Sequence, residues 1–117
     1  MTRSTWHITQ NGDSLVVSRR LPARMDFAVR TDLPDGNRMR LAHQIRQDIW
    51  RALQDLRGFA PVVQVTRGAS GLTVKAGGQV EGKFNHEQVQ QVVAGVLENA
   101  SNRARWVAQA TRGQKET

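Results

Sequence analysis

Apolar and polar residues alternate between Trp6 and Val17, and this alternation predicts a β-hairpin at the start of the chain. Asn-Gly at 11–12 is a strong signal for a two-residue hairpin turn, because both residues tolerate a positive φ. With the turn placed there, the paired residues are Ile8 with Leu15 and Trp6 with Val17. The large apolar side chains then share one face, which indicates a strand pair with one buried side.

The segment that follows the first hairpin predicts a third strand. Over residues 24–30, the apolar residues at 25, 27 and 29 face one side of the strand and the residues between them face the other. This segment follows a turn marked by Pro22. Since neighbours in sequence often pair in a sheet, we expect this strand to complete a three-stranded antiparallel meander.

A second meander is predicted by the same alternation from Val63 to Val74. A turn at 68–69 pairs Val65 with Leu72 and keeps the apolar residues on one face. A three-residue loop over 76–78, with a glycine in the left-handed conformation, keeps Val80 on that face and predicts a last strand over 80–84.

Helical periodicity marks three further segments. Residues 38–57 carry apolar side chains at a 3.6-residue period and end before Gly58, which indicates an amphipathic helix. A second helix is predicted to begin at Asn85, whose position fits an N-cap with a capping box. A shorter helix over 102–112, capped by Ser101, completes the pattern.

These elements predict an α+β fold with two antiparallel three-stranded meanders in the order βββα-βββαα. We expect about six strands, with the helices packed on one face of the sheet. At 117 residues the chain has the length of one domain, which we assign to residues 1–112, with a flexible tail over 113–117.

Composition excludes several classes of protein. The chain has no Cys, so disulfides, thiol nucleophiles and cysteine zinc sites are absent. It contains no apolar run of membrane-spanning or signal-peptide length, and we therefore expect a cytoplasmic protein without a membrane partner. The formal charge of +7 is spread evenly, since residues 1–34, 35–58 and 59–84 each carry +2 and residues 85–117 carry +1. An even spread predicts no concentrated nucleic-acid footprint.

One candidate binding patch lies on the first predicted helix. At 100° per residue, Arg46, Trp50 and Arg57 fall within about 40° of one another, and His43 lies beside them. Guanidinium and indole groups in this pattern suit a protein interface or phosphate contacts. The same pattern also fits a Trp50 that completes the core edge beneath arginine side chains.

A second candidate patch lies near the C-terminus. Arg103, Arg105, Trp106 and Arg112 belong to a segment without Asp or Glu between Asn99 and Lys115. This one-signed segment could bind a protein or phosphate groups. Trp106 could equally cover the core.

No pattern indicates catalysis, a metal or a cofactor. The three His residues, at 7, 43 and 86, stand at no metal-pair spacing, and the glycines fall at predicted turns. The outward sheet face carries no aromatic residue, because Trp6, Phe27 and Phe84 have inward parity. This assignment therefore disfavours stacking of single-stranded RNA on the sheet.

The sequence therefore favours a small non-catalytic interaction module that docks an unknown protein partner through the Arg/Trp helix flank. The alternative is a basic nucleic-acid-binding accessory protein that contacts phosphates through the same residues. Self-association through an edge strand is a further interpretation, because an unpaired edge can pair with another chain.

Overall fold

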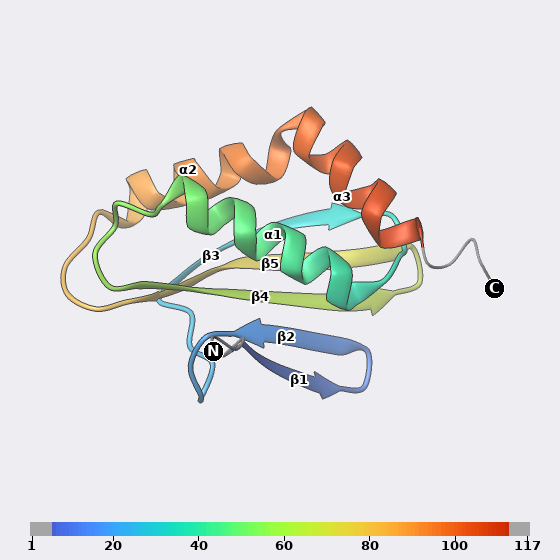
Figure 1. The fold of residues 1–117 in the computed structure, drawn as a ribbon, viewed down its shortest axis with the longest axis horizontal. Coiled ribbons are helices and arrows are strands. Elements are labelled where there is room, and N and C mark those ends of the chain that lie inside the picture. Colours follow the sequence, from blue (N-terminus) through green and yellow to red (C-terminus); the bar gives the residue numbers. More distant parts are fainter. Residues whose placement is uncertain (1–5, 113–117) are drawn as a thin grey trace, which may run out of the picture.

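The computed structural model describes residues 6–112, which form a five-stranded antiparallel sheet and three helices (Figure 1). The predicted tail over 113–117 lies outside the described residues. None of the described helices has the length and apolar character needed to cross a membrane. The elements are β1 (His7–Asn11), β2 (Ser14–Ser18), β3 (Phe27–Leu33), α1 (Arg38–Ala52), β4 (Phe59–Gly68), β5 (Gly71–Val80), α2 (His86–Glu98) and α3 (Ala100–Arg112).

The first hairpin forms, but its register differs by two residues from the prediction. The turn is Gly12-Asp13, and Ile8 pairs with Val17. Gly12 has a φ of 64° and no other residue of the turn has a positive φ, which fits a turn of type II′ with glycine at its first position. Because the shift is an even number, every side chain keeps the face that the alternation predicts.

The second hairpin shows the same shift of two residues. Gly68 pairs with Gly71 around a turn at 69–70, and Val65 pairs with Val74. The predicted facing of the side chains is again confirmed. Alternation thus determines which side chains share a face, whereas the turn determines the register. The predicted burial of that face holds for β2, β4 and β5 but is wrong for β1, whose five residues are all exposed.

The two predicted meanders are wrong, because the strand order is β1-β2-β4-β5-β3. β2 pairs with β4, and β3 pairs with β5 at the opposite edge of the sheet. β4 and β5 are the longest strands and are largely buried, so they occupy the centre and need a neighbour on each side. Local alternation specifies a face for β3 but not the strand beside it.

The predicted loop over 76–78 and the last strand over 80–84 are also wrong, because β5 continues unbroken to Val80. Neither Gly77 nor Gly78 has a positive φ. A Cβ atom at Gly77 would collide with the carbonyl group of Phe27, and one at Gly78 would collide with that of Ala60. These glycines serve the close approach of adjacent strands rather than a turn.

The three predicted helices are present with different ends. α1 ends at Ala52, five residues before the predicted end, where the Leu53 N–H donates to the carbonyl groups of Ile49 and Trp50. The predicted start of α2 is confirmed, since the Asn85 side chain accepts a hydrogen bond from the Gln88 N–H at 3.0 Å. α3 begins at Ala100 rather than 102, and its cap is Asn99 instead of Ser101.

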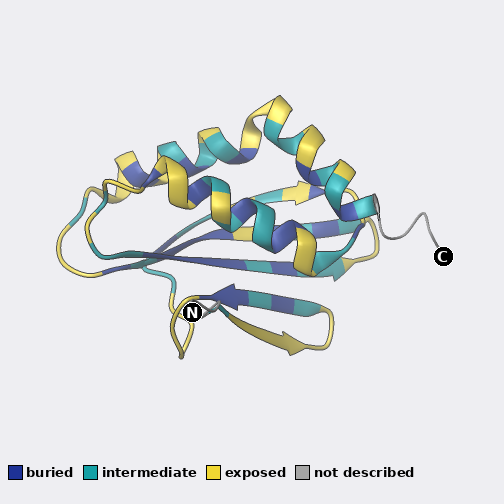
Figure 2. Ribbon diagram, in the orientation of Figure 1, coloured by how far each residue is buried: buried dark blue, intermediate teal, exposed yellow. Residues whose placement is uncertain are grey.

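The helices cover one face of the sheet, and the core lies between the two layers (Figures 1 and 2). Phe27 is buried in this core, and Trp6 and Phe84 pack against it, so the predicted inward facing of these aromatic residues is confirmed. Within the described strands the other face carries no aromatic side chain. β1 lies at the edge of the sheet and is exposed along its whole length (Figure 2).

The close approach at Gly77 yields a stability prediction. We expect Gly77→Ala to lower the free energy of unfolding by at least about 2 kcal/mol, because a backbone carbonyl cannot move away as a flexible side chain can. Gly95→Ala on α2 is the matched control: nothing lies within 4 Å of its added Cβ, so helix propensity should stabilise it by about 0.5–1 kcal/mol. Urea denaturation of both variants tests this, and equal stability of the two would contradict it.

Candidate docking surface

Four residues of α1 form a stripe along the flank that faces the first hairpin. Met39, His43, Arg46 and Trp50 are spaced by four, three and four residues, so they lie above one another on the helix. They adjoin the buried side of α1, which is formed by Leu41, Ala42, Ile45 and Ile49. The flank therefore lies at the boundary between the core and solvent.

The opposite wall of this surface is Trp6 with the exposed strand β1. The Arg46 guanidinium lies over the Trp6 ring, 4.2 Å from its centroid. At the other end of the strand, Gln10 and Met39 line a common hollow of about 250 Å³. We call the surface formed by Trp6, Ile8, Gln10, Met39, His43, Arg46 and Trp50 the α1–β1 surface.

Two cations share the Trp6 ring. The Arg19 guanidinium lies 5.3 Å from the ring centroid, on the side chain that Arg46 also contacts. Partial burial, and then the charge of Arg19, lowers the pKa of Arg46. Within residues 6–112, no carboxylate lies within ion-pair distance of either arginine. Among the described residues, the positive charge of this pair is therefore uncompensated.

His43 is held as an acceptor beside these cations. The Arg46 Nε–H donates a hydrogen bond of 3.2 Å to His43 Nδ1, which requires that nitrogen to be unprotonated. Partial burial, followed by the charge of Arg46, lowers the pKa of His43. The imidazole is thus neutral at physiological pH.

Exposed apolar side chains gather on the same surface. Of the four large hydrophobic residues that are exposed in the described chain, three belong to it: Ile8 at 42%, Met39 at 41% and Trp50 at 43%. Trp50 also borders a hollow of about 470 Å³. The rest of that hollow is lined by Arg19, Arg20, Phe59, Ala60 and Pro61.

The structure brings together three of the four residues predicted for the first patch. His43, Arg46 and Trp50 share the flank, whereas Arg57 lies in the turn beyond the end of α1, because the helix stops at Ala52. Sequence reasoning missed Met39, although it stands four residues before His43 and the helical period could have found it. It also missed the exposed side of β1, since nothing local marks β1 as an edge strand.

The C-terminal candidates make contacts within the chain. Trp106 is fully buried, and its indole N–H donates to Asp48 Oδ2 at 2.7 Å. Arg105 donates to the same carboxylate at 2.8 Å, and Arg103 donates to the Leu97 carbonyl at 2.8 Å. The side chain of Arg112 lies outside the described part of the structure. The three described residues fasten α3 to its neighbours.

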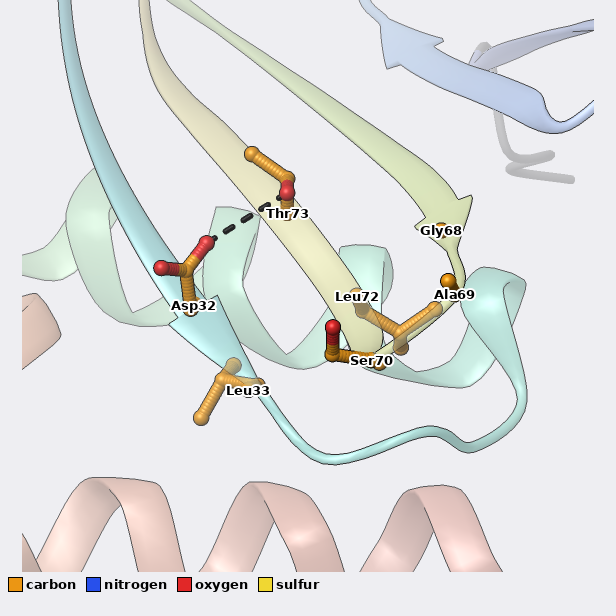
Figure 3. Close-up of a pocket in the computed structure, with 8 residues that line it drawn as sticks. Asp32, Leu33, Gly68, Ala69, Ser70, Leu72 and Thr73 are labelled. Atoms are coloured by element: carbon orange, nitrogen blue, oxygen red, sulfur yellow. Dashed lines mark hydrogen bonds between the residues drawn. The ribbon is translucent and has the colours of Figure 1, made fainter.

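Two other hollows lie at the β4–β5 turn and on the helix-free face of the sheet. Figure 3 shows the hollow at the β4–β5 turn, of about 240 Å³, where the Thr73 hydroxyl donates to Asp32 at 3.3 Å. A hollow of about 270 Å³ on the helix-free sheet face is lined by Arg30, Lys75 and three neutral polar residues. No group of three His, Cys, Asp or Glu side chains in the described chain could hold a metal ion.

Comparison of the chain with protein-family models, with curated proteins and with solved structures finds no match.

The lowered pKa of His43 gives stability a defined pH dependence. Histidine in the unfolded chain titrates near its ordinary value of 6.5, so at and below that pH the unfolded state binds more protons than the folded state. The free energy of unfolding should therefore fall as the pH is lowered from 7.5 to 5. His43→Gln should remove this dependence, whereas His7→Gln on exposed β1 should retain it. Urea titrations across this range provide the measurement, and identical slopes for the two variants would refute the assignment.

The Trp106 hydrogen bond predicts a structural role for Asp48. Asp48→Ala leaves a buried indole N–H without its acceptor, and we expect a loss of about 1–3 kcal/mol in the free energy of unfolding. Asp55→Ala, which changes an exposed carboxylate in the turn after α1, should have an effect below about 0.5 kcal/mol. Thermal and urea unfolding distinguish the two, and an Asp48→Ala variant as stable as the control would contradict the role.

Proposed function

We propose that this chain is a small non-catalytic interaction module that docks a protein partner on the α1–β1 surface. The observation that supports it best is the exposure of Trp50 beside two arginines, Arg19 and Arg46, that have no carboxylate partner within residues 6–112. Trp and Arg are the residues most enriched among interface hot spots. Ile8 and Met39 extend the apolar area beyond the tryptophan.

The surface also suggests the chemistry of the partner. Burial of Arg19 and Arg46 without a counter-charge would be costly, so the partner should supply carboxylates at this point. The exposed Trp50 and its neighbouring hollow would receive an apolar side chain. We therefore propose a partner segment that combines acidic and apolar residues.

The alternative is a nucleic-acid-binding accessory protein that contacts phosphates with Arg19 and Arg46. The uncompensated cations and the net charge of +7 favour it. The helix-free sheet face offers no aromatic platform for base stacking, which leaves phosphate contacts as its source of affinity. Such binding would weaken steeply as the salt concentration rises.

Trp50→Ala tests the docking function. The side chain is about half exposed, so the variant should unfold at nearly the same temperature as the native chain. Its affinity for the partner should fall about 30-fold or more, the effect of losing a hot spot worth about 2 kcal/mol. Gln47→Ala, an exposed change elsewhere on α1, is the control and should bind normally. The partner is first captured from a nuclease-treated lysate and then titrated in purified form.

Three results would count against this assignment. If Trp50→Ala lowers the free energy of unfolding as much as it lowers the free energy of binding, Trp50 has a structural role in the core. Material that is captured only without nuclease, and released by moderate salt, would favour the nucleic-acid alternative. Equal affinity of Trp50→Ala and Gln47→Ala would place the docking site elsewhere.

A further inference from the structure

The two edges of the sheet are treated differently by the fold. At the β3 edge, the Gln90 side chain of α2 donates to the Ala28 carbonyl at 3.3 Å, and Arg103 of α3 donates to the Asp32 carbonyl. β3 also carries the charged residues Arg30 and Asp32. Charges and covering elements are the usual means by which a sheet edge is kept from pairing with another chain.

Within residues 6–112, the β1 edge has none of these protections. Asn11 and Ser14 flank the two-residue turn and bond to each other through both backbone groups. Hydrogen-bonded and non-hydrogen-bonded pairs alternate along an antiparallel ladder, so the N–H and C=O groups of Ile8 and Gln10 point away from β2, toward the free edge. Within the described chain no side chain donates to or accepts from these groups. The strand, His-Ile-Thr-Gln-Asn, contains no Asp, Glu, Lys, Arg or Pro, and its pairing with β2 has no bulge. β1 is therefore a template for one more strand.

Cations stand at both ends of this template. Arg19 and Arg46 meet at Trp6, directly before β1. At the other end, Arg38 donates to the Gly12 carbonyl at 3.3 Å and has no carboxylate within ion-pair distance in residues 6–112. Positive charge thus stands at each end of this five-residue strand.

We propose that β1 receives an extended acidic segment of a partner protein as a sixth strand of the sheet. This rests on the proposed docking function and specifies how the partner binds. Backbone groups of Ile8 and Gln10 would give main-chain hydrogen bonds, and alternate side chains of the added strand would point toward the α1–β1 surface. Carboxylates on that side would meet Arg46 at one end and Arg38 at the other.

Charge complementarity selects this occupant over a second copy of the chain. A second copy would bring another net charge of +7 to the same edge. Antiparallel pairing of two β1 strands would also bring Arg38 of each copy to the end where Arg46 of the other copy lies, leaving the cations uncompensated. An acidic segment removes both costs.

The test uses substitutions that alter the edge without altering the ladder. The Gln10 N–H faces away from β2, so Gln10→Pro removes an edge donor and no hydrogen bond of the hairpin. Gln10→Ala is the matched control, since it shortens the same side chain and keeps the N–H. The probe is a phage-displayed library of random heptapeptides selected on the native chain, followed by a synthetic peptide of the most enriched sequence.

We expect the selected peptides to be acidic, to lack proline, and to bind Gln10→Pro at least about tenfold more weakly than Gln10→Ala. Amide hydrogen exchange supplies a readout that side-chain docking alone would not change: the peptide should slow exchange at Ile8 and Gln10. If Gln10→Pro fails to fold, Ile8→Pro with Ile8→Ala as its control repeats the test at the other edge-facing position.

The outcomes separate strand addition from docking. Strand addition is contradicted if the peptides bind Gln10→Pro as tightly as the native chain but no longer bind Trp50→Ala. That result would still support docking on the α1–β1 surface. If peptide binding is lost with Gln10→Pro but not with Trp50→Ala, the result supports addition of a sixth strand and contradicts a role for the α1 flank in binding. Selection of no peptide, or of basic peptides only, overturns the proposal. A native dimer that Gln10→Pro converts to a monomer in sedimentation experiments assigns the edge to a second copy instead.

Discussion

The packing of α1 across the sheet is the interaction on which the rest of the structure depends. Leu41, Ala42, Ile45 and Ile49 are all buried, and burial of each large apolar side chain contributes about 1.5–3 kcal/mol. The helix lies against β4 and β2, near the centre of the sheet. One helix cannot also cover the edge beyond β2, so β1 and the outer flank of α1 remain exposed. The α1–β1 surface is a consequence of this difference in width between the helix and the sheet.

Electrostatics distinguishes this surface from the other arginine-rich regions. Arg105 and Arg51 share the carboxylate of Asp48, and Arg67 pairs with Asp35, whose pKa is lowered by that contact. The charge of these arginines is paired with carboxylates of the same chain. Ion pairs at the protein surface contribute little stability. Arg19 and Arg46 instead contact a tryptophan ring, an interaction that orients a guanidinium without neutralising it. An anionic partner would therefore encounter oriented and uncompensated charge at one place on the molecule.

Local chemistry made part of the fold and of the site predictable. Alternation identified which side chains face the core, and Asn85 identified the start of α2. The strand order was not predictable, because the neighbour of β3 depends on which distant strands need both edges paired. The spacing of His43, Arg46 and Trp50 predicted the α1 side of the α1–β1 surface. The β1 side of this surface depends on β1 being an edge strand, which the sequence does not show. Arg57 lies outside the surface because α1 ends at Ala52.

Within the described chain, the β1 edge is unprotected and could pair with any extended chain. The net charge of the protein can make this pairing selective. Two copies that approach edge to edge each bring +7, and their repulsion opposes pairing at low ionic strength. The same field would draw an acidic segment toward the edge and accelerate its encounter. Because the backbone groups of β1 would accept almost any extended chain, discrimination must come from the flanking charges. Arg19, Arg38 and Arg46 occupy the positions from which they could impose it, and salt would weaken attraction and repulsion together.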